Sequence, residues 1–124
     1  MEARNDTFGV LDRVSLESYT PPMIPIIETD RYRDWLRELR DRQAAARINT
    51  RVMRLRRGNP GDVAPVGDGV SELRLMFGPG YRVYYAMRDE MLIVLLAGGD
   101  KSTQPKDIET AKALWRDFQD QDDA

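Results

Sequence analysis

Two arginines stand inside consecutive segments that have the pattern of β-strands. The stretch "ELRLMFGPGYRVYYAMRDEMLIVLLAGGDKSTQ" covers residues 72–104 and places Arg74 and Arg82 on either side of a Gly-Pro-Gly turn. A guanidinium group is permanently charged and presents paired donors that match two phosphate oxygens. It can therefore hold a phosphodiester or stabilise the extra charge of a phosphorane transition state.

The register of the predicted hairpin decides which way these arginines point. A three-residue loop, 78–80, pairs Phe77 with Tyr81 and places Leu73 opposite Tyr85. The apolar face then consists of Leu73, Leu75, Phe77, Tyr81, Val83 and Tyr85. The other face consists of Glu72, Arg74, Met76, Arg82, Tyr84 and Ala86. We expect this second face to point away from the core and to form a concave anion site.

An ion pair is the simpler explanation for the same arginines. Arg82 can pair with Glu72 or Glu90 as a surface bridge, because exposed ion pairs are common in proteins. Like charges on adjacent strands repel each other unless an anion lies between them, which favours the anion site. The sequence alone leaves both interpretations open.

Two further side chains can assist an anion site on this face. Lys101 follows Gly98 and Gly99, which allow close backbone approach, and supplies a mobile positive charge at the end of the last strand. Gly-Gly followed by Asp is an ordinary turn signal and matches no phosphate-binding fingerprint. Tyr84, on the arginine face, can stack on a base or donate a proton.

The elements that position these residues follow from periodicity. An isoleucine-rich strand, 24–29, precedes a helix capped by Thr29 or Asp30, and a second helix runs from about residue 43 to the Gly-Asn-Pro at 58–60. Segment 61–69 has turn chemistry with a possible edge strand, residues 70–97 form a meander, and a closing helix begins near Pro105. This order predicts an α+β fold, with a small antiparallel sheet of about four strands packed against two N-terminal helices and a C-terminal helix.

The length of 124 residues favours a single domain. We expect a flexible N-terminal extension over residues 1–22, one domain over 23–118, and a frayed acidic tail over 119–124. No apolar run approaches the 18 or so residues of a membrane span, and the N-terminus lacks the order of a signal peptide. We therefore expect a cytoplasmic protein without a membrane partner.

Composition limits the chemistry that this chain can perform. It has no cysteine and no histidine, which excludes disulfides, thiolate metal sites and the usual acid/base group near neutral pH. Catalysis would therefore use Arg, Lys, Tyr, Asp, Glu or the backbone, with no metal and no cofactor. The segment from Arg31 to Arg57 contains ten arginines and three carboxylates, which gives it a net charge of +7. Such a window attracts phosphate polymers or an acidic protein, although a solvated helix face has the same pattern.

The sequence "SELRLMFGPGYRVYYAMRDEMLIVLLAGGDKSTQPKDIETA" resembles the carboxy-terminal half of RelE/ParE-superfamily toxins. The likeness is closest to the HigB-like, addiction module killer branch of bacterial type II toxin-antitoxin systems. With "RYRDWLRELRD" in the first helix it covers roughly residues 24–118. The resemblance implies a small sheet packed on two N-terminal helices with a further C-terminal helix, in agreement with the order of elements above.

In catalytic members of that superfamily, the implied activity is cleavage of messenger RNA in the ribosomal decoding site. The ribose 2′-hydroxyl attacks the neighbouring phosphate, a reaction that needs positive charge and proton transfer but no metal. Arg82 matches the phosphate-binding arginine, and Arg74 and Lys101 match positions that are basic in many members. Glu72 is a candidate general base or a salt-bridge partner. The candidate catalytic residues are Arg82, Arg74, Lys101, Glu72 and Tyr84.

The resemblance also implies partners. The residues expected to contact ribosomal RNA phosphates are Arg47, Arg51, Arg54, Arg56 and Arg57. The implied partners are the ribosome with its messenger RNA and a cognate antitoxin, which is expected to be a helix-turn-helix protein. Operator DNA would be contacted only through that antitoxin.

This chain departs from the pattern of the catalytic members. It has no histidine, and Ile108 lies near the position where some members place a catalytic tyrosine. Two other functions therefore stay open: a ParE-like toxin that inhibits DNA gyrase through protein contact, and a degenerate toxin that serves as an antitoxin-binding co-repressor.

Overall fold

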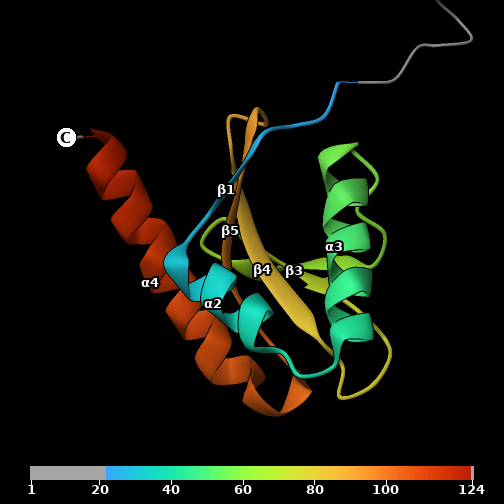
Figure 1. Ribbon diagram of the computed structural model, residues 1–124. Helices are drawn as coiled ribbons and strands as arrows, with labels where there is room; N and C mark the ends of the chain where they lie inside the picture. The colour runs from blue at the N-terminus through green and yellow to red at the C-terminus, as the bar shows by residue number, and fades with distance from the viewer. Residues whose placement is uncertain (1–21, 124) are drawn as a thin grey trace, which may run out of the picture.

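A five-stranded mixed sheet lies at the centre of residues 22–123, the part of the chain that the computed structural model describes (Figure 1). Its strands, in the order β1-β5-β4-β3-β2, are β1 (Ile26–Glu28), β2 (Val63–Gly67), β3 (Val70–Arg74), β4 (Arg82–Arg88) and β5 (Leu92–Gly99). The helices are α2 (Asp30–Glu38), α3 (Arg42–Arg56) and α4 (Gln104–Asp123), with a 3₁₀ turn, η1 (Lys101–Thr103), before α4. The α+β class is confirmed. Most of the predicted N-terminal extension, residues 1–21, lies outside the described residues.

The sheet differs from the predicted one in its first strand. Strands β3 to β5 form the expected antiparallel meander, and β2 is the edge strand that segment 61–69 left open. Strand β1 pairs in parallel with β5, so the sheet is mixed and has five strands. A three-residue strand carries too little local pattern to specify its partner. Its pairing is set by α2, which follows it directly and packs on β5.

Local capping explains where the first two helices begin and where α3 ends. The side chain of Thr29 accepts a hydrogen bond from the Tyr32 amide at 3.1 Å and caps α2, as predicted. The side chain of Asp41 caps α3 in the same way, through the Ala44 amide. After α3, Gly58 adopts φ +85°, a left-handed conformation that favours glycine and stops the helix.

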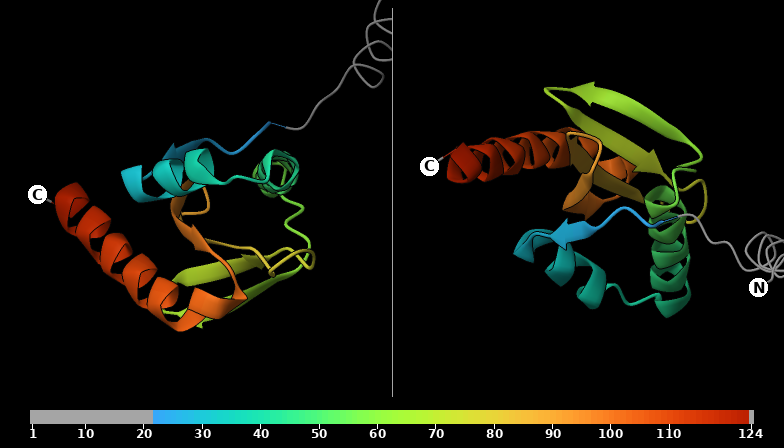
Figure 2. Two further views of the ribbon diagram at one scale, coloured as in Figure 1. Left: turned by 60° about the horizontal axis from the view of Figure 1, so that its bottom comes forward. Right: turned by 90° about the horizontal axis from the view of Figure 1, so that it is seen from above.

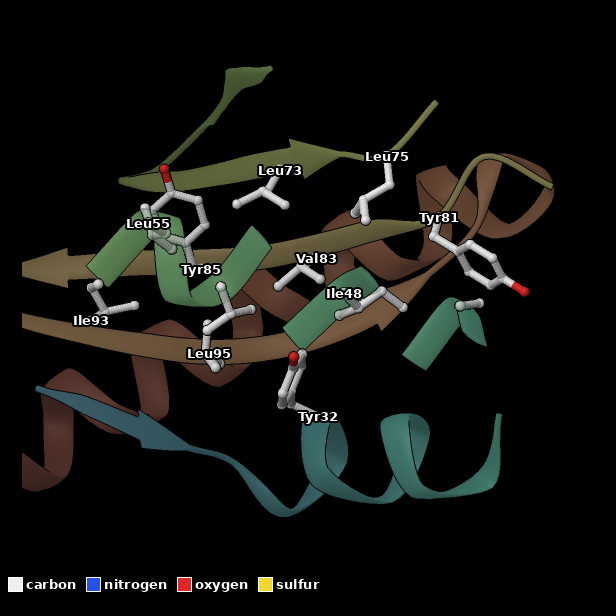
Figure 3. Packing of buried hydrophobic residues seen from close by; sticks show 12 residues of the cluster. Tyr32, Ile48, Leu55, Leu73, Leu75, Tyr81, Val83, Tyr85, Ile93 and Leu95 are labelled. Carbon is white, nitrogen blue, oxygen red and sulfur yellow. The ribbon is translucent and has the colours of Figure 1, made fainter. Parts of the chain in front are cut away.

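Helices cover both faces of the sheet (Figure 2). One face packs against the apolar sides of α2 and α3, where Tyr32, Ile48, Leu73 and Leu95 are completely or almost completely buried (Figure 3). The other face packs against α4 through Trp115 and its apolar neighbours. The prediction that the arginine face points away from the core is therefore wrong where α4 covers it, at Tyr84 and Ala86. Arg74 and Met76, on the same face, stay exposed.

The hairpin register differs from the predicted one by two residues. Leu73 lies opposite Val83, not Tyr85, and Arg74 lies opposite Arg82. The connection is longer than three residues, because Leu75 donates its amide to the Tyr81 carbonyl and residues 76–80 lie outside the ladder. A register shift of two residues leaves every side chain on the same face of the sheet. The six residues of the predicted apolar face do lie in one cluster.

The closing helix is longer than expected. Pro105 lies in its first turn, as predicted, but α4 continues to Asp123, through most of the segment that we expected to fray after residue 118. Within the described residues, no helix combines the length and the apolar character that crossing a membrane requires.

Candidate functional site

Arg82 lies at the start of β4 and is largely enclosed. Only 8% of the residue is exposed, and its Nη1 donates a hydrogen bond to the Gly80 carbonyl at 2.7 Å. Its Nε is buried at 3.6 Å from Oε1 of Glu72, beyond hydrogen-bond distance but within an ion pair. Among the described residues, none accepts a hydrogen bond from Nη2. One edge of the guanidinium is therefore anchored, and the other remains available.

Glu72 is the anchor of this arginine and is itself 2% exposed. Its Oε2 accepts a hydrogen bond from Nε2 of Gln104 at 2.6 Å and lies 3.5 Å from the Tyr84 hydroxyl. A buried carboxylate engaged by three neighbours is suited to orienting a cation, and it is poorly placed to take a proton from a substrate. The pairing of Arg82 with Glu72 was an open alternative in the sequence, but the pair is buried and not a surface bridge.

Tyr84 cannot stack on a base in this structure, contrary to the sequence-based expectation. It is fully buried, in the cluster that α4 covers. Burial, and then the nearby charge of Glu72, raise the pKa of the Tyr84 hydroxyl above its ordinary value. Its role here is to fill the core and to contact Glu72.

Arg74 is opposite Arg82 but has a different environment. It forms an exposed ion pair with Asp62, with Nη2 2.7 Å and Nε 3.1 Å from Oδ1 of that residue. This hydrogen bond, and then the charge of Asp62, raise the pKa of Arg74. The structure therefore brings the two arginines together in the ladder while giving each its own carboxylate, which removes the repulsion that argued for an anion between them.

Lys101 does share a depression with Arg82. The depression has a volume of about 260 Å³ and is lined by Met76, Phe77, Gly78, Pro79, Gly80, Arg82 and Lys101. Lys101 is exposed, and its amide donates to the Pro79 carbonyl at 3.3 Å, which ties η1 to the β3–β4 connection. We name this depression the Arg82 pocket. It places two cations around an open concavity.

The five arginines predicted to contact RNA fall into two groups. Arg51 donates to the carbonyls of Arg74, Pro60 and Asp62, and Arg56 donates to the Ile24 carbonyl, so both tie α3 to the backbone of other segments. Burial, and then the charge of Arg54, lower the pKa of Arg51.

The other three are exposed. Arg54 and Arg57 lie near the end of α3, and the guanidinium of Arg47 lies 4.1 Å from the centre of the Phe77 ring. Arg47, Arg51 and Arg54 follow one another at helical spacing, which gives them a common face of α3. Two structural arginines therefore interrupt the predicted row of phosphate contacts.

A second depression adjoins the Arg82 pocket. It also measures about 260 Å³ and is lined by Arg47, Thr50, Arg51, Leu75, Met76 and Phe77. We name it the Arg47 pocket. The two pockets share Met76 and Phe77 in their linings, so they are next to each other. The sequence predicted Phe77 as a core residue and did not indicate that it lines a pocket. It also did not indicate the contact of Gln104 with Glu72, because no local motif marks either residue.

The fold and these two pockets define a small α+β protein with a basic, partly apolar surface. The chain matches the model of the family described as "Phage derived protein Gp49-like (DUF891)" over residues 34–116 and belongs to that family, which is toxin-like. It is 50% identical over 95 residues to an uncharacterized protein of Haemophilus influenzae, a match that covers 77% of this chain and 96% of that protein. No solved structure matches the chain.

Proposed function

We propose that this protein is the toxin of a type II toxin-antitoxin system and cleaves messenger RNA on the ribosome without a metal. The observation that carries the proposal is the Arg82 pocket, in which an anchored guanidinium and the flexible side chain of Lys101 border one open depression. Membership of a toxin-like family agrees with it.

The chemistry expected at this site is attack of a ribose 2′-hydroxyl on the adjacent phosphate. The transition state carries more negative charge on the phosphoryl oxygens than the substrate does, and preorganised cations stabilise it at no cost of reorientation. Arg82 is preorganised by Gly80 and Glu72, and Lys101 adds a mobile charge. In this proposal Arg82 and Lys101 contact the substrate, whereas Glu72 and Gln104 position Arg82.

Exposed arginines of α3 would bind the RNA at a distance from the scissile bond. Arg54 and Arg57 are free to contact phosphates, which would make the affinity depend on salt. Because Arg51 and Arg56 hold the backbone, their replacement would disturb the fold before it affected RNA binding. A cognate antitoxin that covers these cations would restrain the activity, and a helix-turn-helix protein encoded beside this chain is the expected partner.

Induced expression in cells tests the nuclease directly. We expect new 5′ ends in messenger RNA, aligned with codons, from the unaltered protein. Arg82→Lys keeps a positive charge but loses the planar group and should reduce cleavage by roughly a hundredfold or more. Arg116→Lys, an exposed position on α4, is the matched control and should cleave normally. Circular dichroism would establish that both variants are folded. Absence of new ends with the unaltered protein would reject the nuclease.

A second candidate is a ParE-like toxin that inhibits DNA gyrase. The absence of histidine and of a clear general acid on the closing helix favours it, and the buried pair of Arg82 with Glu72 is also compatible with a purely structural role. Growth arrest occurs with either activity, so the same induction experiment should also record the supercoiling of a reporter plasmid. Disturbed supercoiling without new messenger RNA ends would support gyrase inhibition. Neither effect would favour an antitoxin-binding co-repressor.

A further inference from the structure

The Arg47 pocket has a lining unlike that of a phosphate site. Leu75, Met76 and Phe77 provide apolar walls, and Met76 is 78% exposed although it is a large apolar side chain. Arg51 borders the pocket, but its terminal nitrogens are occupied by backbone carbonyls. A phosphate would therefore meet mainly carbon here. A flat ligand with apolar faces and polar edges would match these walls better.

Arg47 and Phe77 form a platform for such a ligand. The Arg47 guanidinium lies 4.1 Å from the Phe77 ring centre, within the range of a cation–π contact, and Arg47 as a whole is exposed. Packing on the ring restricts an otherwise mobile side chain before any ligand arrives, which reduces the entropy lost on binding. Nucleobases stack on aromatic rings and on arginine planes in single-stranded RNA complexes.

We propose that the Arg47 pocket binds one nucleobase of single-stranded RNA, stacked on the Arg47–Phe77 pair, beside the nucleotide whose phosphate contacts Arg82. The inference rests on the proposed function, since it assigns a subsite for the same RNA. Met76 and Phe77 line both pockets, so an RNA chain lying across these two side chains would place a base in one pocket and a phosphate in the other. The Thr50 hydroxyl donates to the Ala46 carbonyl at 3.1 Å, which leaves its oxygen able to accept from a base amino group.

Two fluorescent oligonucleotides separate base stacking from phosphate binding. The first is a single-stranded pentaribonucleotide with 2′-O-methyl riboses, which cannot be cleaved by 2′-hydroxyl attack. The second has the same sugars and phosphates but no bases. Fluorescence anisotropy over a series of salt concentrations gives the affinity of each for the purified protein. We expect the oligonucleotide with bases to bind roughly tenfold more tightly than the abasic one.

Arg47→Lys is the decisive variant, because it keeps the charge and removes the plane. It should reduce the affinity for the oligonucleotide with bases by roughly tenfold and leave the abasic affinity unchanged. The salt dependence should stay the same, since the number of cations is unchanged. Phe77→Leu should have the same selective effect through loss of the ring. Arg116→Lys, far along the sequence on α4, should bind both oligonucleotides as the unaltered protein does.

Several results would overturn the subsite. They are equal affinity of the unaltered protein for the two oligonucleotides, an equal loss for both in Arg47→Lys, or no binding of either. Failure of the nuclease is a separate result: the base preference can be present and sensitive to Arg47→Lys while induced cells show no new messenger RNA ends. In that case the chain would bind single-stranded RNA without cleaving it.

Discussion

Arg74 and Arg82 lie directly opposite each other in the β3–β4 ladder, yet their surroundings differ in almost every respect. Arg82 is enclosed and anchored by a buried carboxylate, Glu72. Arg74 is exposed and pairs with an equally exposed carboxylate, Asp62. The comparison shows that residue type and strand position do not determine what an arginine can do. Its burial and contacts depend on the elements that cover it.

The difference arises from the places of the two strands in the sheet. β4 is central, and on its far side Arg82 lies opposite Gly99 of β5, just before η1 and the start of α4. Gln104, the first residue of α4, donates a hydrogen bond to Glu72 and helps to bury that carboxylate. Arg74 ends β3, beside the edge strand β2, where the neighbour is the exposed segment around Asp62. Burial therefore makes one arginine rigid and leaves the other solvated.

The largest expected effect comes from breaking the buried pair. Glu72→Ala leaves the guanidinium of Arg82 enclosed without its carboxylate and should lower the free energy of unfolding by about 3–5 kcal/mol. Urea unfolding followed by circular dichroism measures this loss. Asp62→Ala is the matched control at the exposed pair and should shift the urea midpoint very little.

A double variant tests whether burial is the cause. Replacing both partners with apolar residues, Glu72→Leu with Arg82→Met, should recover most of the stability that Glu72→Ala loses, because no charge is left buried. Under the proposed function, the recovered protein should not cleave messenger RNA, because it lacks Arg82. If the double variant were as unstable as the single one, packing around Glu72 and not charge pairing would explain the loss.

The smaller alkaline effect concerns Tyr84, which contacts the buried pair. Its pKa is raised in the folded protein, so folding favours the protonated hydroxyl. That contribution is complete below the ordinary tyrosine pKa of about 10 and is lost as pH rises above it, by up to about 1.4 kcal/mol for each pH unit. Burial also raises the pKa of the Tyr32 and Tyr85 hydroxyls, so both contribute to the same loss of stability at high pH.

Tyr84→Phe keeps the ring and removes this titration. Between pH 9 and pH 11 the variant should lose less stability than the unaltered protein, by about 1 kcal/mol at pH 11. Unfolding in urea at several pH values measures the difference. An identical pH dependence of the two proteins would mean that Tyr84 is no more buried than a surface tyrosine.

Sequence patterns predicted the α+β class, a cap of α2 at Thr29 or Asp30, the end of α3 near Gly58 and the apolar face of the hairpin, because each depends on residues close together in the chain. Alternation assigned Leu73 and Tyr85 to one side correctly even with the register wrong by two, since a shift of two preserves the side. It also placed Arg74 and Arg82 on a common face. The expectation that Arg82 lies on an exposed face is wrong.

That failure has a physical reason. The closing helix was predicted, but no local signal shows which face of the sheet a helix covers. The cover by α4 decides the burial of Glu72 and Tyr84, and the contact between Gln104 and Glu72 joins residues 32 positions apart. Contacts with backbone carbonyls also join distant positions, 23 residues apart for Arg51 with Arg74 and 32 for Arg56 with Ile24. The strands that carry Arg74 and Arg82 were thus predicted from the sequence, whereas the burial and contacts of these arginines depend on tertiary packing.

The smallest expected effect is that of Arg74→Gln. Its side chain is exposed and its partner Asp62 is solvated, so the unfolding midpoint should hardly change at low salt and not at all at 1 M salt, where the pair is screened. The segment keeps its other supports, because Arg51 still binds the Arg74 carbonyl and the Arg74 amide still donates to the Asp62 carbonyl. Under the proposed function, an assay of messenger RNA cleavage distinguishes the two arginines: Arg74→Gln should cleave nearly normally, whereas Arg82→Lys should not. If Arg74→Gln reduced cleavage as strongly as Arg82→Lys, then Arg74 would release Asp62 to contact the RNA, and the two arginines would act together as the superfamily resemblance implies.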